Sequence, residues 1–402
     1  MARNRAGPRW LLSRSRRATL PPALARLPRP YLWMHSDDPR QAQSLAALSA
    51  AALHRETGLC VLLSLPKATI PDLPDLPGRV VLPVERDATA LVQAMDANGH
   101  LPAAVLLTAR KLPAGMLTAL ARKQVPVLAI DADAPDLDSG WRHLPGFSRH
   151  VLTRLDHVFL QSTGARAAWL DRGLAPEALS ICGKVSAMPA ALGCNEAERD
   201  ALAEAFRLRP VWLAVSLPER EEAMVMAAHR EALRESHRLA LILHPSDPHR
   251  GPALRARFSA QFNTALRSVD DPVTPETQVY IADTEGERGL WYRLAVACYL
   301  GGSLTGDGAM TTPLEPAALG CAIVHGRFFG RHPDAFDLLR AARATRMIQS
   351  AEALGSAICT ALRPEQASDQ AHRGWQVISN GHEATETVLS ALERAALRDR
   401  AC

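Results

Sequence analysis

The chain has 402 residues, of which 47% are hydrophobic and 22% are charged, so it is long enough for two domains that each bury a core. Its net charge is +4 with neutral histidines, and no segment interleaves basic and aromatic residues, which argues against a nucleic-acid partner.

The N-terminal segment, residues 1–30, is predicted to be a separate basic stretch. The first 36 residues carry eight arginines and no acidic residue. No stretch approaches the roughly 20 apolar residues needed to span a bilayer, and no export signal is evident. Two readings stay open: a contact with an anionic membrane surface, and a solvated basic tail.

Residues 31–190 are predicted to form an N-terminal α/β domain. Short runs rich in Val, Ile and Leu alternate with longer amphipathic segments, which indicates parallel strands covered by helices on both faces. The expected strands begin at Cys60, Val80, Ala103, Pro126, His157 and Ala178.

The same pattern then restarts. We expect a linker with a short helix at residues 191–210, a second α/β domain at 211–372 and a C-terminal helix at 373–402. The strands of the second domain are expected to begin at Val211, Leu239, Gln278, Ala295, Ala322 and Ala344. The predicted fold is therefore α/β with two tandem Rossmann-like domains and an interdomain cleft, and ligands should bind beyond the carboxyl ends of the strands.

The sequence lacks the motifs of several common enzyme classes. No G-x-G-x-x-G follows the first predicted strand, and no P-loop, H-E-x-x-H or G-x-S-x-G occurs. The seven cysteines show no C-x-x-C spacing. This argues against a disulfide framework and a structural zinc, and favours a reducing cytoplasm.

Polar segments follow four strands of the second domain: "SLPEREE", "HPSDPHR", "ADTEGERGLWY" and "GGSLTGDGAMTTPLEPAALG". A hydroxyl and backbone N–H groups at a helix start suit an anion, glycines allow close backbone approach, and Glu315 can accept both hydroxyls of a ribose. Taken singly, each feature also fits a helix cap or a turn. Together they predict a nucleotide-sugar site that includes Ser216, Gly301, Gly302 and Glu315.

The order of these motifs resembles the 3-deoxy-D-manno-octulosonic acid (Kdo) transferases. The residues that carry the resemblance are Gln161 and Ser162, Ser216 and Glu219, "DT-x-GE" at 283–287, "GGSL" at 301–304 and "PLEPA" at 313–317.

The resemblance implies the GT-B architecture and an inverting transfer from a CMP-activated sugar to a lipid A precursor or another lipid-linked or glycan acceptor. It implies no cofactor and no metal ion at the reaction centre. Helix N-termini and nearby basic groups such as Arg250 are expected to stabilise the leaving phosphate. It also implies a cytoplasmic protein, with peripheral contact at the inner face of the bacterial inner membrane. The resemblance further implies that Pro245 and Ser246, Glu285, Gly286 and Glu287, and the segment from Thr312 to Glu315 stand where the family contacts CMP. It adds Ser303, from the "GGSL" motif, to the donor-site candidates.

The chain departs from the family pattern where the family carries out catalysis. Gln41 stands at the position of the general-base glutamate, and a neutral amide cannot take a proton near pH 7. Thr108 and Arg110 stand where the family has acids, and Ser246 replaces a phosphate-facing arginine. Ser186 replaces a lysine, although Lys184 lies close by in the sequence.

Three side chains are candidates for a relocated base: Asp38, Asp37 and His35. The aspartates follow the same strand as Gln41, and their alternative role is to cap the helix that begins near Pro39. His35 has a pKa suited to base catalysis, and its alternatives are to orient a phosphate or to pack. The alternative function is a catalytically silent paralogue that binds a nucleotide or assists assembly; a nucleotide-sugar epimerase ranks last.

Overall fold

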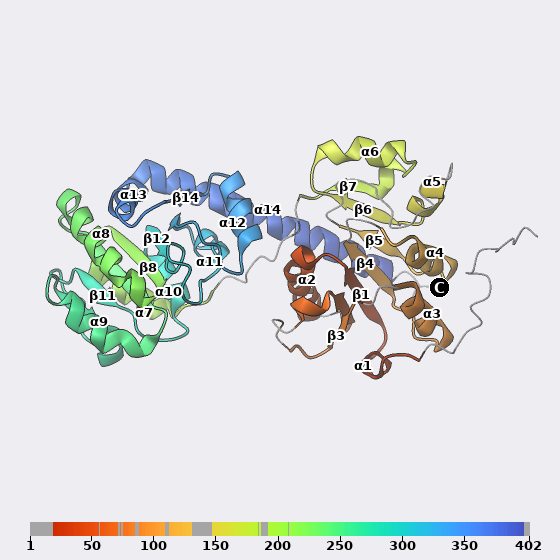
Figure 1. The fold of residues 1–402 in the computed structure, drawn as a ribbon, viewed down its shortest axis with the longest axis horizontal. Coiled ribbons are helices and arrows are strands. Elements are labelled where there is room, and N and C mark those ends of the chain that lie inside the picture. Colours follow the sequence, from red (N-terminus) through yellow and green to blue (C-terminus); the bar gives the residue numbers. More distant parts are fainter. Residues whose placement is uncertain are drawn as a thin grey trace, which may run out of the picture. The chain divides into compact units, whose positions relative to one another are not determined.

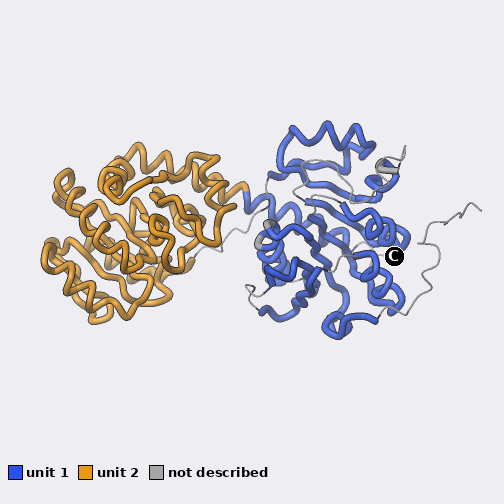
Figure 2. The backbone as a smooth tube through the Cα atoms, viewed as in Figure 1, with its two compact units in different colours: residues 1–187, 381–402 blue, residues 188–380 orange. Residues whose placement is uncertain are grey.

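The described residues form two parallel β-sheets of seven strands each (Figure 1). The computed structural model describes residues 19–55, 57–70, 73, 75–84, 88–108, 112–130, 147–183, 185, 192–207 and 209–397. The chain divides into two compact units (Figure 2). Unit 1 contains residues 1–187 and 381–402, and unit 2 contains residues 188–380.

The sheet of unit 1 has the strand order β3-β2-β1-β4-β5-β6-β7, with every described pair parallel. Its strands are β1 (Tyr31–Ser36), β2 (Cys60–Leu65), β3 (Arg79–Pro83), β4 (Ala104–Thr108), β5 (Val127–Ala129), β6 (His157–Leu160) and β7 (Leu179–Ile181). Its helices are α1 (Pro22–Ala25), α2 (Ala42–His54), α3 (Ala88–Ala97), α4 (Ala114–Arg122), α5 (Phe147–Leu152) and α6 (Arg166–Asp171).

Alternation along β1 shows why both faces of this sheet are covered. Tyr31 and Trp33 pack in one core with α3, α4, α5 and α6. Leu32 and Met34 pack in another core with α2 and the end of α14 (Pro364–Leu397). Because successive side chains point to opposite faces of a strand, a continuously apolar strand requires helices on both sides.

The sheet of unit 2 has the strand order β10-β11-β9-β8-β12-β13-β14, again parallel. Its strands are β8 (Val211–Leu217), β9 (Ala240–Pro245), β10 (Thr264–Leu266), β11 (Val279–Ile281), β12 (Ala297–Leu300), β13 (Ala322–His325) and β14 (Thr345–Met347). Its helices are α7 (Glu196–Phe206), α8 (Glu222–Glu235), α9 (Gly251–Phe258), α10 (Arg288–Leu294), α11 (Leu314–Ala318), α12 (Pro333–Ala341) and α13 (Ala353–Ala361).

The predicted class, α/β with two tandem Rossmann-like domains of the GT-B kind, is confirmed by these two sheets. The structure contains two strands that were not among the expected ones. β1 was mentioned only as the strand that precedes Asp37, with no bounds, and β10 has three residues. The C-terminal helix begins at Pro364 rather than at residue 373, and it passes from unit 2 into unit 1. The predicted cleft between the domains stays a prediction.

Candidate functional site

The carboxyl ends of β8, β9, β11 and β12 bring the predicted donor residues of unit 2 to one edge of the sheet. Ser216, near the end of β8, has φ +51° and is buried. Its backbone N–H donates to Nδ1 of His244 at 3.3 Å. Burial lowers the pKa of His244 to about 4, so this ring is neutral near pH 7 and can accept that hydrogen bond.

The glycine pair after β12 is required by close backbone packing. A Cβ on Gly301 would lie 2.5 Å from the carbonyl oxygen of Ser216, and one on Gly302 would lie 2.2 Å from that of Asp307. Gly302 also has φ +78°, a conformation that side chains other than glycine rarely adopt. The close backbone approach predicted at this turn is therefore made to protein backbone, by Gly301 to the end of β8 and by Gly302 to Asp307.

A buried glutamate holds this glycine loop in place. Glu221 is 1% exposed and lies in the 3-10 helix η7 (Glu219–Glu221) that follows β8. Its Oε2 accepts from the N–H of Gly302 at 2.8 Å and from the hydroxyl of Tyr299 at 3.0 Å. Its Oε1 accepts from the N–H groups of Leu304 and Thr305, at 3.2 and 2.9 Å, and from the Thr305 hydroxyl at 2.9 Å.

The family motif in the same segment points to Glu219, whereas Glu221 makes the contacts with the loop. Glu219 is exposed and makes an ion pair with Arg250. The sequence does show an acidic residue directly after a strand and, separately, a glycine-rich loop with several backbone N–H groups that need acceptors. Only the fold shows that this carboxylate accepts from that loop.

Glu315 lies in the first turn of α11, where the sequence placed a ribose ligand. Its carboxylate is 11% exposed, with Oε1 3.3 Å from an Arg288 guanidinium nitrogen and Oε2 accepting from the Tyr292 hydroxyl at 3.3 Å. Burial raises the pKa of Glu315, and Arg288 and Tyr292 oppose that shift. Thr312 accepts from the N–H of Leu314 through its hydroxyl at 3.3 Å, which closes the turn before the helix.

The segment after β11 divides into a structural part and an exposed part. Glu287 is held by Arg267 at 2.9 Å and by the Thr284 hydroxyl. Burial acts to raise the pKa of Glu287, but hydrogen bonds from Arg267 and Thr284 and the charge of Arg267 hold it below its usual range. Glu285 and Gly286 are exposed, and Gly286 has φ +80°.

The segment after β9 carries fewer ligand groups than the sequence suggested. Pro245 ends the strand, and the N–H of the exposed Ser246 donates to the carbonyl of Leu217 at 2.9 Å. Arg250, which we expected near a phosphate, instead contacts the buried Glu222 at 2.8 Å and Glu219 at 3.0 Å. The guanidinium that lies against Glu315 is that of Arg288.

Ser303, also a predicted ligand, is fully buried and accepts from the N–H of Gly326 at 2.8 Å.

In unit 1, His35 lines a cavity of about 370 Å³. The ring is 4% exposed, and its Nδ1 lies 2.8 Å from the hydroxyl oxygen of Ser64. The indole N–H of Trp33 donates to the same oxygen at 2.7 Å. Burial lowers the pKa of His35 to about 4.

The other base candidates lie just beyond β1. Asp37 is exposed and Asp38 is half-buried, and both take part in interactions with other groups. The 3-10 helix η2 (Pro39–Gln41) begins directly after them. Oε1 of Gln41 is buried and has no hydrogen-bond partner among the residues that the structure describes.

The other positions of this chain that correspond to polar family positions are Thr108, which is neutral, and three residues outside the described part of the chain. Thr108 is 1% exposed and donates its hydroxyl proton to the Ser36 oxygen at 3.0 Å. Arg110, Lys184 and Ser186 lie outside the described residues. The described part of the chain contains no group of three His, Cys, Asp or Glu side chains arranged to hold a metal ion.

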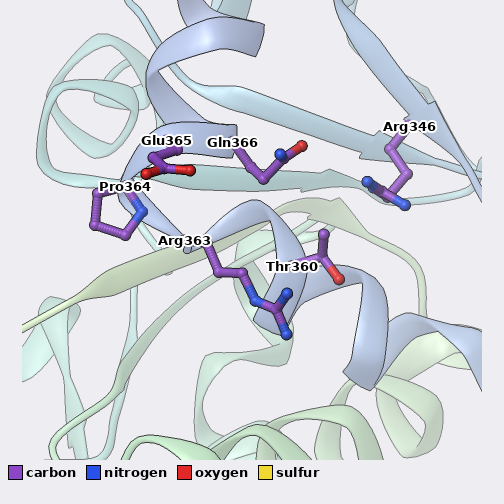
Figure 3. A pocket seen from close by; sticks show the side chains of 6 residues that line it. All are labelled: Arg346, Thr360, Arg363, Pro364, Glu365 and Gln366. Carbon is purple, nitrogen blue, oxygen red and sulfur yellow. The ribbon is translucent and has the colours of Figure 1, made fainter.

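A second pocket, of about 610 Å³, lies in unit 2 at the start of α14 (Figure 3). Arg346 comes from β14, Thr360 from α13, and Arg363 from the turn before α14, while the first turn of α14 supplies three more lining residues. None of the predicted donor or base residues lines this pocket.

The comparisons with known proteins agree with the motifs. No protein-family model matches the chain. The 3-deoxy-D-manno-octulosonic acid transferase of Haemophilus influenzae is 27% identical over 188 residues, 46% of this chain and 44% of that protein. The enzyme of the same name from Bordetella pertussis is 29% identical over 312 residues, 73% of this chain and 69% of that protein. The chain resembles the Kdo transferase family.

A solved structure is similar to part of the chain as well. The C-terminal CMP-Kdo binding domain of WaaA from Acinetobacter baumannii is 25% identical, with a TM-score of 0.41, and covers 47% of this chain and 98% of that domain. The chain spans less than half the length of the first Kdo transferases it matches, from Haemophilus influenzae and Arabidopsis thaliana. The activity, substrates and partners of these relatives are therefore proposals for this chain.

Proposed function

We propose that the chain is a Kdo transferase-like glycosyltransferase that moves a sugar, Kdo from CMP-Kdo, to a hydroxyl group of a lipid A precursor or a related glycan. The observation that carries the proposal is the edge of the unit 2 sheet. There Glu221 fixes the glycine loop, and Glu315 stands half-buried beside Arg288 and Tyr292.

Each part of this edge has a task in donor binding. The Glu315 carboxylate can accept hydrogen bonds from the two ribose hydroxyls, and Arg288 supplies positive charge beside it for the phosphate. The exposed residues Glu285 and Gly286 and the Ser246 hydroxyl are left to contact the base or the sugar. Charge that develops on the departing phosphate is stabilised by such preorganised groups. The reaction is proposed to invert the sugar and to need no metal ion or cofactor.

Calorimetric titration with CMP, CDP and UDP tests donor binding, and transfer of labelled Kdo from CMP-Kdo to a lipid A precursor tests the reaction. We expect CMP to bind more tightly than UDP. The absence of binding by any of the three nucleotides would overturn the proposal.

A second function is favoured by Gln41 and Thr108, neutral groups at positions where the family has acids. It is a catalytically silent paralogue that binds a nucleotide and serves as an assembly protein. This function predicts CMP binding with no sugar transfer to any acceptor, whereas the transferase predicts both.

We also propose a peripheral position at the cytoplasmic face of the inner membrane. The arginines of residues 1–36 support it, and residues 1–18 lie outside the described part of the chain. No helix in the described residues is long and apolar enough to cross a bilayer. Co-sedimentation with phosphatidylglycerol vesicles, but not with phosphatidylcholine vesicles, is the expected result, and equal recovery with both would contradict it.

A further inference from the structure

His244 lies near the carboxyl end of β9, on the face of the unit 2 sheet that α10 and α11 cover. Along β9, Leu243 packs in the core with α8 and α9, whereas Ile242 packs in the core with α10 and α11. Because side chains alternate along a strand, His244 points to the same face as Ile242. The helices on that face carry Arg288 and Glu315, so His244 lies on the same side of the sheet as the two charged groups of the donor edge.

The contact with Ser216 decides which ring nitrogen of His244 carries the proton. Nδ1 accepts from the backbone N–H of Ser216 at 3.3 Å. A ring nitrogen that accepts a hydrogen bond uses its lone pair and carries no proton of its own. Burial lowers the pKa of the ring to about 4, so near pH 7 it holds a single proton. That proton is on Nε2, which makes Nε2–H a hydrogen-bond donor.

Nε2 of His244 is free to bind a ligand. It has no hydrogen-bond partner among the residues that the structure describes, and it is not one of their fully buried polar atoms. The residue as a whole is half-buried. The guanidinium of Arg288 lies close enough for its charge to act on the ring, and it is 3.3 Å from Oε1 of Glu315. A neutral N–H donor and a cation therefore lie near one another at the donor edge.

We propose that Nε2–H of His244 donates a hydrogen bond to the phosphate of the bound nucleotide, beside Arg288. The assignment rests on the proposed function, in which the sugar donor is CMP-activated. A phosphate group presents ionised acceptor oxygens, and hydrogen bonds to an ionised acceptor are stronger than those to a neutral one. The positive charge of Arg288 favours the phosphate over a neutral acceptor of the base at the same place.

The other groups expected at the phosphate are neutral or already paired. Ser246 stands at the position of the family's phosphate-facing arginine, and its side chain carries no charge. Arg250 forms an ion pair with the buried Glu222 at 2.8 Å. Arg288 faces a carboxylate of the same edge, so part of its charge is already balanced. The imidazole adds a donor at this edge without adding a further charge that would have to be desolvated.

His244→Asn tests the contact, because asparagine keeps an oxygen that can accept from the N–H of Ser216 and has no atom at the place of Nε2. Calorimetric titration compares CMP with cytidine, which lacks the phosphate. We expect the variant to bind CMP about 10- to 100-fold more weakly, as for a lost hydrogen bond to a charged group, and to bind cytidine like the wild type. The matched control is His237→Asn, at an exposed histidine before the amino end of β9, which should leave both affinities unchanged.

A second measurement follows the ring in the wild-type chain. Long-range proton–nitrogen NMR spectra of the histidine rings report which nitrogen carries the proton. The signal of His244 is assigned by its loss in His244→Asn or, should that variant fail to fold, in His244→Gln. We expect the Nε2–H form in the free chain, and a shift of the Nε2 signal that is large with CMP and small with cytidine.

The outcomes separate this assignment from the proposed function. Equal losses for CMP and cytidine in His244→Asn, an unchanged CMP affinity, or an Nδ1–H form in the free chain would each overturn the assignment of His244. A wild-type chain that binds neither ligand contradicts the proposed function, and with it the phosphate ligand. A chain that shows the phosphate-selective loss but transfers no sugar contradicts the transferase and leaves the His244 contact standing.

Discussion

Replacing Glu221 by glutamine tests the idea that one buried carboxylate organises the donor edge. Five donors converge on its two oxygens, three of them backbone N–H groups of the glycine loop. Glutamine keeps one oxygen and turns the other into an amide donor. In either orientation, at least one of the N–H groups of Gly302, Leu304 and Thr305 then faces a donor and loses its acceptor.

The expected loss follows from these contacts. An orphaned buried N–H costs about 1–3 kcal/mol, and the bonds that remain lose their charge assistance, so we expect unit 2 to lose about 3 kcal/mol of its free energy of unfolding. For a unit of this size, residues 188–380, that corresponds to a melting temperature lower by about 6–12 °C.

Three measurements decide the result. Scanning calorimetry reports the stability of unit 2, amide hydrogen exchange at 302, 304 and 305 reports the loop, and CMP titration reports the site. The matched control is Glu219→Gln, two residues away, whose carboxylate is 66% exposed and which should cost less than about 1 kcal/mol. If Glu221→Gln melted within 1 °C of that control with unchanged exchange at the loop, the reasoning would be refuted.

Three further predictions concern Gly301 and Glu315 at the donor edge of unit 2 and His35 in unit 1. Gly301→Ala places a methyl 2.5 Å from the Ser216 carbonyl and should weaken CMP binding in calorimetry, whereas Gly193→Ala, with no atom within 4 Å, should not. Because burial raises the pKa of Glu315, CMP affinity should fall on acidification at a pH above 4.5, and Glu315→Gln should remove that dependence and cost about tenfold in affinity. Burial lowers the pKa of His35 from 6.5 to about 4. Because the unfolded chain therefore takes up a proton more readily than the folded chain, the free energy of unfolding falls as the pH drops from 6.5 toward 4. Relative to His35→Asn, the wild type should lose about 3 kcal/mol of its free energy of unfolding between pH 7 and pH 4 in urea unfolding, and a difference that stays constant with pH would contradict this.

The donor edge shows how far local sequence could go. Glycines, a helix-opening glutamate and polar residues after apolar strands could be read in order along the chain, because strand exits in a parallel sheet meet at one edge. What the sequence could not show is which partner each side chain would take. Arg250 was expected near a phosphate, but it forms an ion pair at 2.8 Å with Glu222, the first residue of α8.

The sequence by itself determined the periodicity of two α/β series, the glycine turn at 301–302 and the loss of the glutamate at Gln41. These are local properties, set by side-chain alternation, φ freedom and residue identity. Only the tertiary structure decided that Glu221 binds the glycine loop some 80 residues away and that Ser64 contacts one ring nitrogen of His35 at the wall of a cavity. Hydrogen bonds between distant segments depend on the register of neighbouring strands, which no single stretch of sequence encodes.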